Sequence, residues 1–214
     1  MPPFILASSS PRRRELLASL GIAFTVVKPD IDETQLPGEP PLDYVRRLSQ
    51  QKAAAAAARL AAPAAVLAAD TAVILGADTL GIDGQGTILG KPATPDEAWD
   101  MLRRLRGRAH QVVTALTLAR LSPAAPLALD TRLTTSRVVM RDYTDTEIEA
   151  YIATGDPFDK AGGYAIQHAG FNPVAQVEGS YTNVVGLPLE TLCAMLDAIG
   201  WPYTPLTDRA GDPA

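Results

Sequence analysis

The stretch FILASSSPRRRELL, at residues 4–17, decides how this chain begins its fold. Its apolar start, Phe4–Ala7, predicts a short buried strand. Ser10 suits the N-cap of a helix, and Pro11 suits the first helical position because the N–H that proline lacks would have no partner there. Leucines follow at helical spacing. The stretch therefore predicts a strand, a hydroxyl-rich loop and a helix in direct succession.

This junction collects groups that bind anions. The helix N-terminus offers backbone N–H groups, the loop offers serine hydroxyls, and Arg12 and Arg13 fall in the first helical turn. A solvated, arginine-rich helix face is the alternative. Cations at a helix N-terminus oppose the macrodipole, however, and an anionic ligand would reverse that cost. The pattern favours a loop that binds phosphate.

The composition is that of a soluble globular protein. The 214 residues suffice for one sizeable core, and 47% hydrophobic with 20% charged residues is an ordinary balance. A net charge of −5 and an aromatic content of 6% argue against a nucleic-acid binder, which would show a basic stripe with interleaved aromatics. Any phosphate-binding patch is therefore local.

The cysteine and histidine content and the absence of a visible targeting signal indicate the cellular compartment and argue against a zinc site. The lone Cys193 cannot form an internal disulfide, which fits a reducing cytosol, and its apolar neighbours indicate a packed side chain. His110 and His168 lack metal-ligand spacing, so we expect no zinc site. Charged residues interrupt the N-terminal apolar run, and Arg59 and Pro63 break the alanine-rich stretch. We expect a cytoplasmic protein with no signal peptide and no membrane partner.

Strand and helix patterns alternate along the chain, which predicts an α/β fold with a mixed sheet. We expect parallel pairs early and an antiparallel hairpin in the middle. No linker or repeat is visible, so we expect a single domain over residues 1–203 and a flexible tail at 204–214. The expected strands lie at 4–7, 24–27, 65–69 with a continuation at 72–75, 111–119, 131–140, 164–167 and 174–177; the expected helices follow Ser10 and lie at about 42–60, 95–105, 144–153 and 187–199; turns and loops fill 28–41, 78–86 and 155–163.

Asp70 directly follows the apolar run 65–69. We therefore expect it at the end of a strand, facing a ligand crevice. A carboxylate that follows a buried strand needs a partner for its charge, and either a divalent cation or a lysine would serve. A turn or capping aspartate is the alternative, but no convincing helix follows.

Other charged residues are less decisive when each is taken alone. Asp30, Asp32 and Glu33 form an acidic cluster that could recruit Mg²⁺, although a solvated acidic loop is the simpler interpretation. Lys52 lies in the long predicted helix, where a lone lysine is usually exposed to solvent. Lys91 lies between a glycine and a proline, so it has few conformations and suits a fixed charge against phosphate.

Two glycine-containing segments complete the set. The segment DKAGGYAIQ, residues 159–167, has paired glycines that let backbone approach a ligand closely. Its Gln167 offers an amide donor and an acceptor, which is enough to read the edge of a base. The segment GSYTNVVGLP, residues 179–188, indicates a turn that leads into a helix and can be purely structural.

Together these segments resemble the Maf family of nucleoside triphosphate pyrophosphatases. The resemblance runs from about residue 4 to residue 199, and its motifs occur in the family's order. They are SxSPRRxELL from Ser8, KA at 52–53, ADT at 69–71, GKP at 90–92, DKAGGYAIQ at 159–167, and GSY with GLP between 179 and 188.

The resemblance implies an elongated α/β fold of the inosine-triphosphate-pyrophosphatase type, with a mixed central sheet flanked by helices and two lobes around a cleft. It implies hydrolysis of a triphosphate between its α and β phosphates, with Mg²⁺ or Mn²⁺ as cofactor, and a possible homodimer. The ADT and GYxIQ motifs look like the branch that prefers dTTP and UTP. The alternative is a non-catalytic, nucleotide-binding regulator of cell division.

The resemblance also implies roles for individual residues. By motif position, Asp70 would be the proton acceptor. The expected catalytic set is Asp70, Glu33, Lys52 and Lys91, with Asp70 and Glu33 also as metal ligands; the expected substrate-binding set is Ser8, Ser10 and Arg12, together with Arg13, Thr71 and Gln167 at positions associated with base selection. The chain departs from the family pattern at Ser9, where glycine is common and serine would stiffen the phosphate loop. It also departs at His168 and 172–173, and this second change puts the fine base preference in doubt, not the reaction.

Overall fold

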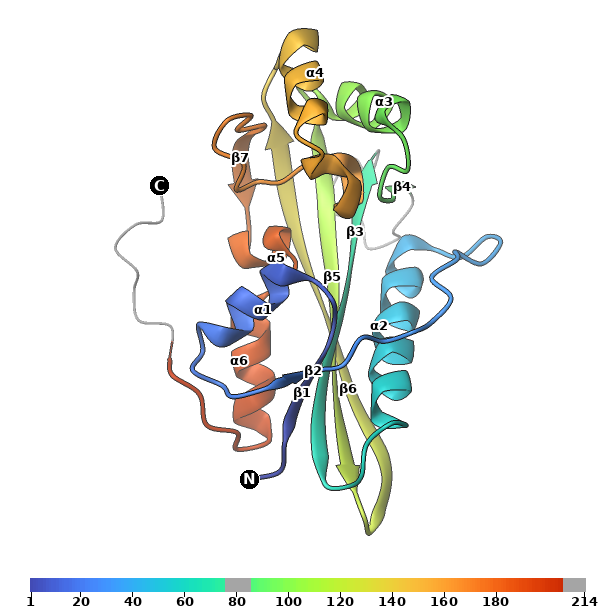
Figure 1. Cartoon of the computed structure of the whole chain (residues 1–214), viewed down its shortest axis with the longest axis vertical. Helices are drawn as coiled ribbons and strands as arrows, with labels where there is room; N and C mark the ends of the chain where they lie inside the picture. Colours follow the sequence, from blue (N-terminus) through green and yellow to red (C-terminus); the bar gives the residue numbers. More distant parts are fainter. Residues whose placement is uncertain (76–85, 206–214) are drawn as a thin grey trace.

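The computed structural model describes residues 1–75 and 86–205. Within them a mixed sheet of seven strands has the order β2-β1-β3-β5-β6-β7, and β4 pairs with β3. The long strands β3, β5 and β6 run through much of the molecule (Figure 1). The strands are β1 Phe4–Ala7, β2 Thr25–Val26, β3 Ala64–Leu75, β4 Thr87–Leu89, β5 Ala109–Ser122, β6 Ala125–Met140 and β7 Val174–Glu178.

The sheet is parallel at one edge and antiparallel elsewhere, as the sequence predicts. β1 runs parallel to β2 and β3, whereas β3–β5, β5–β6 and β6–β7 are antiparallel. The predicted hairpin is β5–β6, and its strands extend to Ser122 and from Ala125, so the turn is shorter than expected. The hairpin therefore forms the longest continuous pairing in the sheet.

Helices cover both faces of the sheet (Figure 1). α1 and α6 pack on one face, α2 packs on the other, and α3 and α4 lie at one end of the long strands. None of the helices within the described ranges is long and apolar enough to cross a membrane. They are α1 Pro11–Ala18, α2 Pro41–Ala57, α3 Pro95–Leu105, α4 Asp145–Ala153, α5 Tyr181–Val185 and α6 Leu189–Ala198, with short 3₁₀ turns η1 Asp156–Asp159 and η2 Ala161–Gly163.

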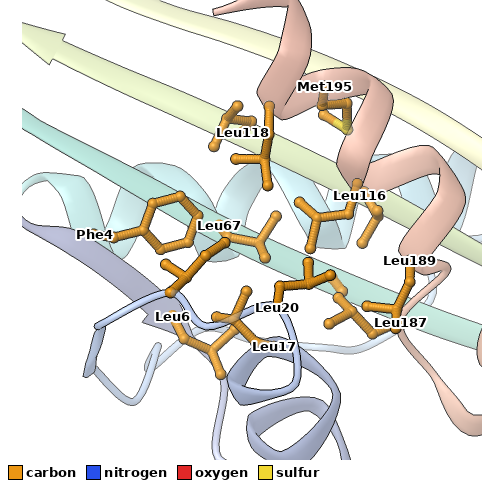
Figure 2. Packing of buried hydrophobic residues seen from close by; sticks show 14 of the residues in the cluster. Phe4, Leu6, Leu17, Leu20, Leu67, Leu116, Leu118, Leu187, Leu189 and Met195 are labelled. Atoms are coloured by element: carbon orange, nitrogen blue, oxygen red, sulfur yellow. The ribbon is translucent and has the colours of Figure 1, made fainter. Parts of the chain in front are cut away.

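The core follows from the alternation of side chains along β3. Leu67 packs with Leu17 of α1 and with Leu20 in the turn after it (Figure 2), whereas its neighbours Val66 and Ala68 pack toward the alanines of α2. A further apolar cluster, which includes Tyr143 and Tyr164, lies at the other end of β3 and β5. The same long strands thus support apolar clusters on both of their faces and toward both of their ends.

Several sequence expectations need correction. Asp70 does not end a strand: the runs 65–69 and 72–75 join into β3, and Asp70 lies within it. Residues 164–167 do not form a strand, because glycines with φ of +72° and +70° turn the backbone just before Tyr164. The helix expected at 187–199 is α6, with ends shifted by one or two residues; a further short helix, α5, precedes it and ends at Gly186, where φ is +119°.

Other boundaries shift by a few residues. The strand expected at 24–27 is only β2, and the helix expected at 42–60 runs from Pro41 to Ala57. The predicted loops at 28–41 and 155–163 contain short turns, including η1 and η2. Most of the predicted turn at 78–86 and of the predicted tail at 204–214 lies outside the described residues.

Candidate active site

The site begins where β1 ends. β1 pairs with β3 only up to Ala7 opposite Ala68, and β4 pairs with β3 only from Val73 onward. Between these points the structure pairs no described strand with this edge of β3. The carboxyl end of a short parallel strand beside a longer neighbour creates a crevice. Asp70 therefore lies beside the point where the neighbouring strand β1 has stopped, and not at the end of its own strand.

The loop after β1 folds as the sequence predicts. The Ser10 side chain caps α1 by accepting a hydrogen bond from the Arg13 N–H at 3.4 Å, and Pro11 begins the helix. The Ser8 hydroxyl accepts from the Ser10 N–H at 3.2 Å. These contacts aim the N-terminus of α1 and the serine hydroxyls into the crevice.

A buried lysine joins two carboxylates at the centre of the site. Lys52 Nζ lies 2.5 Å from Asp70 Oδ1 and 3.1 Å from Glu33 Oε1. Lys52 and Asp70 are 6% and 7% exposed, whereas the Glu33 side chain is half exposed. The interpretation of Lys52 as an exposed helical lysine is therefore wrong. Asp32, in the same acidic cluster, instead accepts from the Thr34 N–H, as in a local turn.

The electrostatics of Asp70 suit a proton acceptor. Burial raises the pKa of Asp70 above its ordinary value, although the nearby charges of Lys52 and Arg13 oppose this effect. A carboxylate whose pKa lies closer to neutral binds a proton more readily than an exposed aspartate.

The Arg13 guanidinium donates most of its hydrogen bonds to other residues of the protein. Its Nε donates to the Gly186 carbonyl at 2.8 Å, Nη1 to the Ala69 carbonyl at 2.8 Å, and Nη2 to Thr71 Oγ1 at 3.0 Å. A longer contact of 3.5 Å joins Nη1 to the Ser8 hydroxyl. Four of its five N–H donors thus have protein acceptors. Arg13 fixes the bare edge of β3 to α1 and to the turn between α5 and α6.

Two connected cavities make up the cleft. One has a wall in which apolar side chains alternate with polar and charged ones, Thr71 and Gln167 among them; because the other cavity has fewer apolar side chains, we call this one the apolar cavity. The other is polar and contains the serine loop with Glu33 and Lys52. The apolar cavity is also lined by Val73, Val112, Tyr164, Ile166, Val184 and Val185, and both cavities share Ser10, Arg12, Arg13, Lys91 and Asp159.

The cleft brings together nearly all the residues that the sequence singles out. Of the expected site residues, only Asp70 is absent from the cavity walls, and it lies directly behind Lys52. Alternation along β3 turns Asp70 toward α2 and its neighbour Thr71 toward Arg13 of α1. One strand therefore serves the two ends of the cleft with adjacent residues on opposite faces.

Comparison with known sequences decides the family. The Maf-like protein family matches residues 3–199. The chain belongs to the Maf family. This member is 48% identical over 201 residues to the dTTP/UTP pyrophosphatase of Anaeromyxobacter dehalogenans strain 2CP-1, covering 94% of this chain and 96% of that protein. It is 46% identical over 199 residues to the dTTP/UTP pyrophosphatase of Geobacter sp. strain M21, covering 91% and 93%.

Solved structures show a more distant likeness. The Ham1 protein of Staphylococcus aureus aligns with a TM-score of 0.48 at 15% identity, covering 92% of this Maf-family chain and 99% of that protein. A nucleoside-triphosphatase, or dITP/XTP pyrophosphatase, of Mycobacterium abscessus aligns with a TM-score of 0.43 at 13% identity, covering 92% and 96%.

The structure adds cleft residues to which the sequence gave no individual role. Asp159 and Lys160 begin the DKAGGYAIQ motif and line the cleft, and Lys160 is only 7% exposed. Tyr164 forms part of the apolar wall, and its hydroxyl lies 2.7 Å from Nε2 of the buried His110. Presence in a dense motif was the only signal for the first three, and nothing local pointed to His110.

The carboxylates of the site are the groups that could hold a divalent metal ion. No group of three or more histidine, cysteine or acidic side chains within residues 1–75 and 86–205 is arranged to hold a metal ion. Glu33 and Asp70 nevertheless converge on one point, now taken by the Lys52 ammonium. Two carboxylates suffice for Mg²⁺ when substrate phosphates and waters complete its shell. The donor set therefore fits a cation that shares its ligands with a phosphorylated substrate.

Proposed function

We propose that this protein is a nucleoside triphosphate pyrophosphatase that hydrolyses dTTP and UTP to the monophosphate and pyrophosphate. The buried Lys52–Asp70 pair, beside a cationic cavity that opens into an apolar one, carries the proposal. The relatives at 46–48% identity that bear the name dTTP/UTP pyrophosphatase support it. Modified pyrimidine triphosphates belong to the same proposed substrate class.

The two cavities match the two ends of such a substrate. We place the triphosphate in the polar cavity, where the N-terminus of α1 and the serine hydroxyls supply donors for phosphate oxygens. The base then occupies the apolar cavity, and the sugar lies beside the residues that both cavities share. Apolar side chains combined with polar groups that can fix the orientation of a ligand are typical of base and cofactor pockets.

Counting hydrogen-bond donors shows which cations can reach phosphate. Lys52 donates one hydrogen bond to Asp70 and forms an ion pair with Glu33, which leaves at least one of its three N–H donors without a partner in residues 1–75 and 86–205. Arg12 makes one hydrogen bond, to Asp159, within the described part of the chain, and Lys91 is exposed at the cleft. We assign phosphate binding to Arg12, Lys91 and the remaining donor of Lys52. Arg13 instead holds the cleft together.

Base selection falls to the polar groups of the apolar cavity. Thr71 is fixed between Arg13 at 3.0 Å and Thr114 at 2.9 Å, so it presents a rigid edge. The Gln167 amide offers both a donor and an acceptor, which complements a pyrimidine edge carrying a carbonyl and an N–H. We propose that Gln167 reads the base, and that Arg13 contributes by holding Thr71.

The reaction forms one bond and breaks another at the α-phosphorus. Water attacks this phosphorus, Asp70 accepts the water proton, and the bond to the bridging oxygen breaks as pyrophosphate leaves. Lys52 keeps Asp70 oriented, while Arg12 and Lys91 neutralise negative charge that grows on the departing group. Fixed positive groups are worth most where charge develops in the transition state.

We propose Mg²⁺ or Mn²⁺ as the cofactor, held by Glu33 and Asp70 together with phosphate oxygens. Such a cation would supply further charge neutralisation at the phosphates. The catalytic unit in this proposal is a single domain over residues 1–203, acting in the cytoplasm, with a homodimer as the expected assembly. A non-catalytic regulator would need the cationic loop but not the buried lysine and its two carboxylates.

A product assay tests the proposal. The purified protein is incubated with UTP, dTTP, CTP, ATP and GTP in the presence of Mg²⁺, and nucleotide products, pyrophosphate and orthophosphate are quantified separately. We expect monophosphate and pyrophosphate in equal amounts, fastest from UTP and dTTP. Orthophosphate with diphosphate would show that a different bond is cut. Tight nucleotide binding without turnover would favour the regulator.

A further inference from the structure

A chain of hydrogen bonds links the base end of the cleft to Arg12. The Ala165 N–H donates to the Tyr151 hydroxyl at 3.0 Å, and that hydroxyl donates to Asp156 Oδ2 at 2.9 Å. Lys160 Nζ then joins Asp156 Oδ1 at 2.8 Å to Asp159 Oδ1 at 2.6 Å. This series of hydrogen bonds begins at Ala165 and ends at Asp159, and both residues line the cleft.

Lys160 cannot itself bind substrate phosphate. Its three N–H donors are used by Asp156 Oδ1, the Asp156 carbonyl at 2.7 Å and Asp159 Oδ1. Its side chain is also buried. The charge of this lysine therefore acts through the carboxylate that it holds, not through direct contact with a ligand.

Asp159 carries the chain to the cleft. One carboxylate oxygen, Oδ1, is held by Lys160, and the other, Oδ2, accepts from Arg12 Nη1 at 3.2 Å. Partial burial alone would raise the pKa of Asp159, but the hydrogen bond from Lys160 and the Arg12 charge outweigh it and hold the pKa below its ordinary value. Asp159 is therefore ionised at neutral pH and stays paired with both Lys160 and Arg12.

We propose that Asp159 is a positioning residue: anchored by Lys160, it holds the Arg12 guanidinium at the junction of the two cavities, ready for phosphate. This inference rests on the proposed function, in which Arg12 binds the triphosphate. A long arginine side chain loses conformational freedom when it engages a ligand. Holding it in place beforehand reduces that cost, and four of its N–H donors stay available.

The opposite effect is physically possible and gives the opposite result. A carboxylate beside the phosphate site repels phosphate and competes for Arg12. If repulsion dominated, removing the charge of Asp159 would tighten nucleotide binding. Because Lys160 neutralises Asp159 from the buried side, we expect positioning to outweigh repulsion.

A double-mutant cycle tests the proposal with α,β-imido-UTP, which binds without being cleaved. The variants are Asp159→Asn, Arg12→Gln and the double variant, and the dissociation constants are measured by calorimetry with Mg²⁺ present. We expect Asp159→Asn to weaken binding about tenfold in the wild-type background. In the Arg12→Gln background it should cause no further loss, because the side chain that it positions is already gone.

Two controls separate positioning from folding and from the activity itself. Asp130 pairs with Arg132 at 3.0 Å in an exposed contact outside both cavities, so Asp130→Asn should leave binding unchanged. Thermal unfolding of each variant monitors the fold. Tighter binding of Asp159→Asn, or an equal loss in both Arg12 backgrounds, would overturn the inference. A wild-type protein that binds the analogue but cleaves no UTP would instead overturn the proposed function.

Discussion

The Lys52 ammonium lies 2.5 Å from Asp70 Oδ1, with both side chains shielded from solvent. Burying two charges carries a desolvation penalty that a single close contact does not always offset. Apolar residues of similar volume would stabilise this position in α2 and β3 equally well or better. The pair therefore points to a chemical role.

Replacement of the proposed base tests the chemistry directly. Asp70→Asn keeps the shape of the side chain but cannot accept a proton from water. We expect kcat with UTP to fall at least about a hundredfold, the usual contribution of a general base, while nucleotide binding persists. Pyrophosphate release measures the rate. Turnover at the wild-type rate would remove Asp70 from the reaction.

Replacement of the lysine tests the pair as a structural element. Lys52→Met leaves the Asp70 carboxylate buried without its partner, so we expect the free energy of unfolding to fall by about 3 kcal/mol. Urea unfolding at pH 7 measures it. Arg46→Met breaks the exposed Arg46–Asp43 pair in the same helix and should change stability little. Similar losses in the free energy of unfolding for both variants would show that the buried Lys52 pair contributes no more to stability than an exposed ion pair.

The buried histidine should make stability depend on pH. Burial lowers the pKa of His110 to about 4, whereas the pKa of a histidine in the unfolded chain is about 6.5. Between these values the unfolded chain binds a proton that the native protein excludes. Stability should therefore be fully present above pH 6.5 and fall by about 3 kcal/mol as pH drops to about 4.

Urea unfolding at a series of pH values isolates this contribution. Carboxylates titrate in the same range, so the informative quantity is the difference between wild type and His110→Gln. We expect a flatter pH dependence in the variant. His168→Gln serves as the matched control, since His168 lies in the turn before Phe171 and accepts from its N–H at 2.9 Å. Parallel curves for wild type and His110→Gln would contradict the prediction.

The Gln167 amide in the wall of the apolar cavity should govern base preference. Gln167→Ala removes the amide but leaves the serine loop and the buried pair in place. We expect the ranking of kcat/KM among UTP, dTTP and CTP to change while cleavage itself continues. Measuring all three substrates with one enzyme preparation gives the ranking. If the order and the ratios stay as in the wild type, another residue reads the base.

Local signals in the sequence predicted much of the architecture. The N-cap at Ser10, the proline at Pro11 and the β5–β6 hairpin all depend on neighbours within a few residues. Such features are readable because capping and alternation are local properties of the chain. The motif resemblance then brought distant segments together that periodicity alone could not join.

The expectations about the site that were wrong involve partners far along the chain. An aspartate inside a buried strand looked like a strand end because Lys52, which satisfies its charge, lies in a helix eighteen positions earlier. Tyr164 looked like part of a strand because it is apolar and buried, yet it packs in the core and meets His110. The donor use of Arg13 likewise depends on Gly186, which no local pattern links to α1.

The place of Asp70 within β3 has a consequence for how this scaffold can be altered. β3 is paired with β5 in continuous register from Ala64 to Ile74, and a slip of one residue would turn the carboxylate to the opposite face. The proposed hydrolytic centre is thus fixed by the register of β3, while Gln167 belongs to a separate segment that lines the other end of the cleft. In this proposal, redesign for a new nucleobase can therefore be confined to the residues around Gln167, with Asp159 and the residues proposed to break the bond left unchanged.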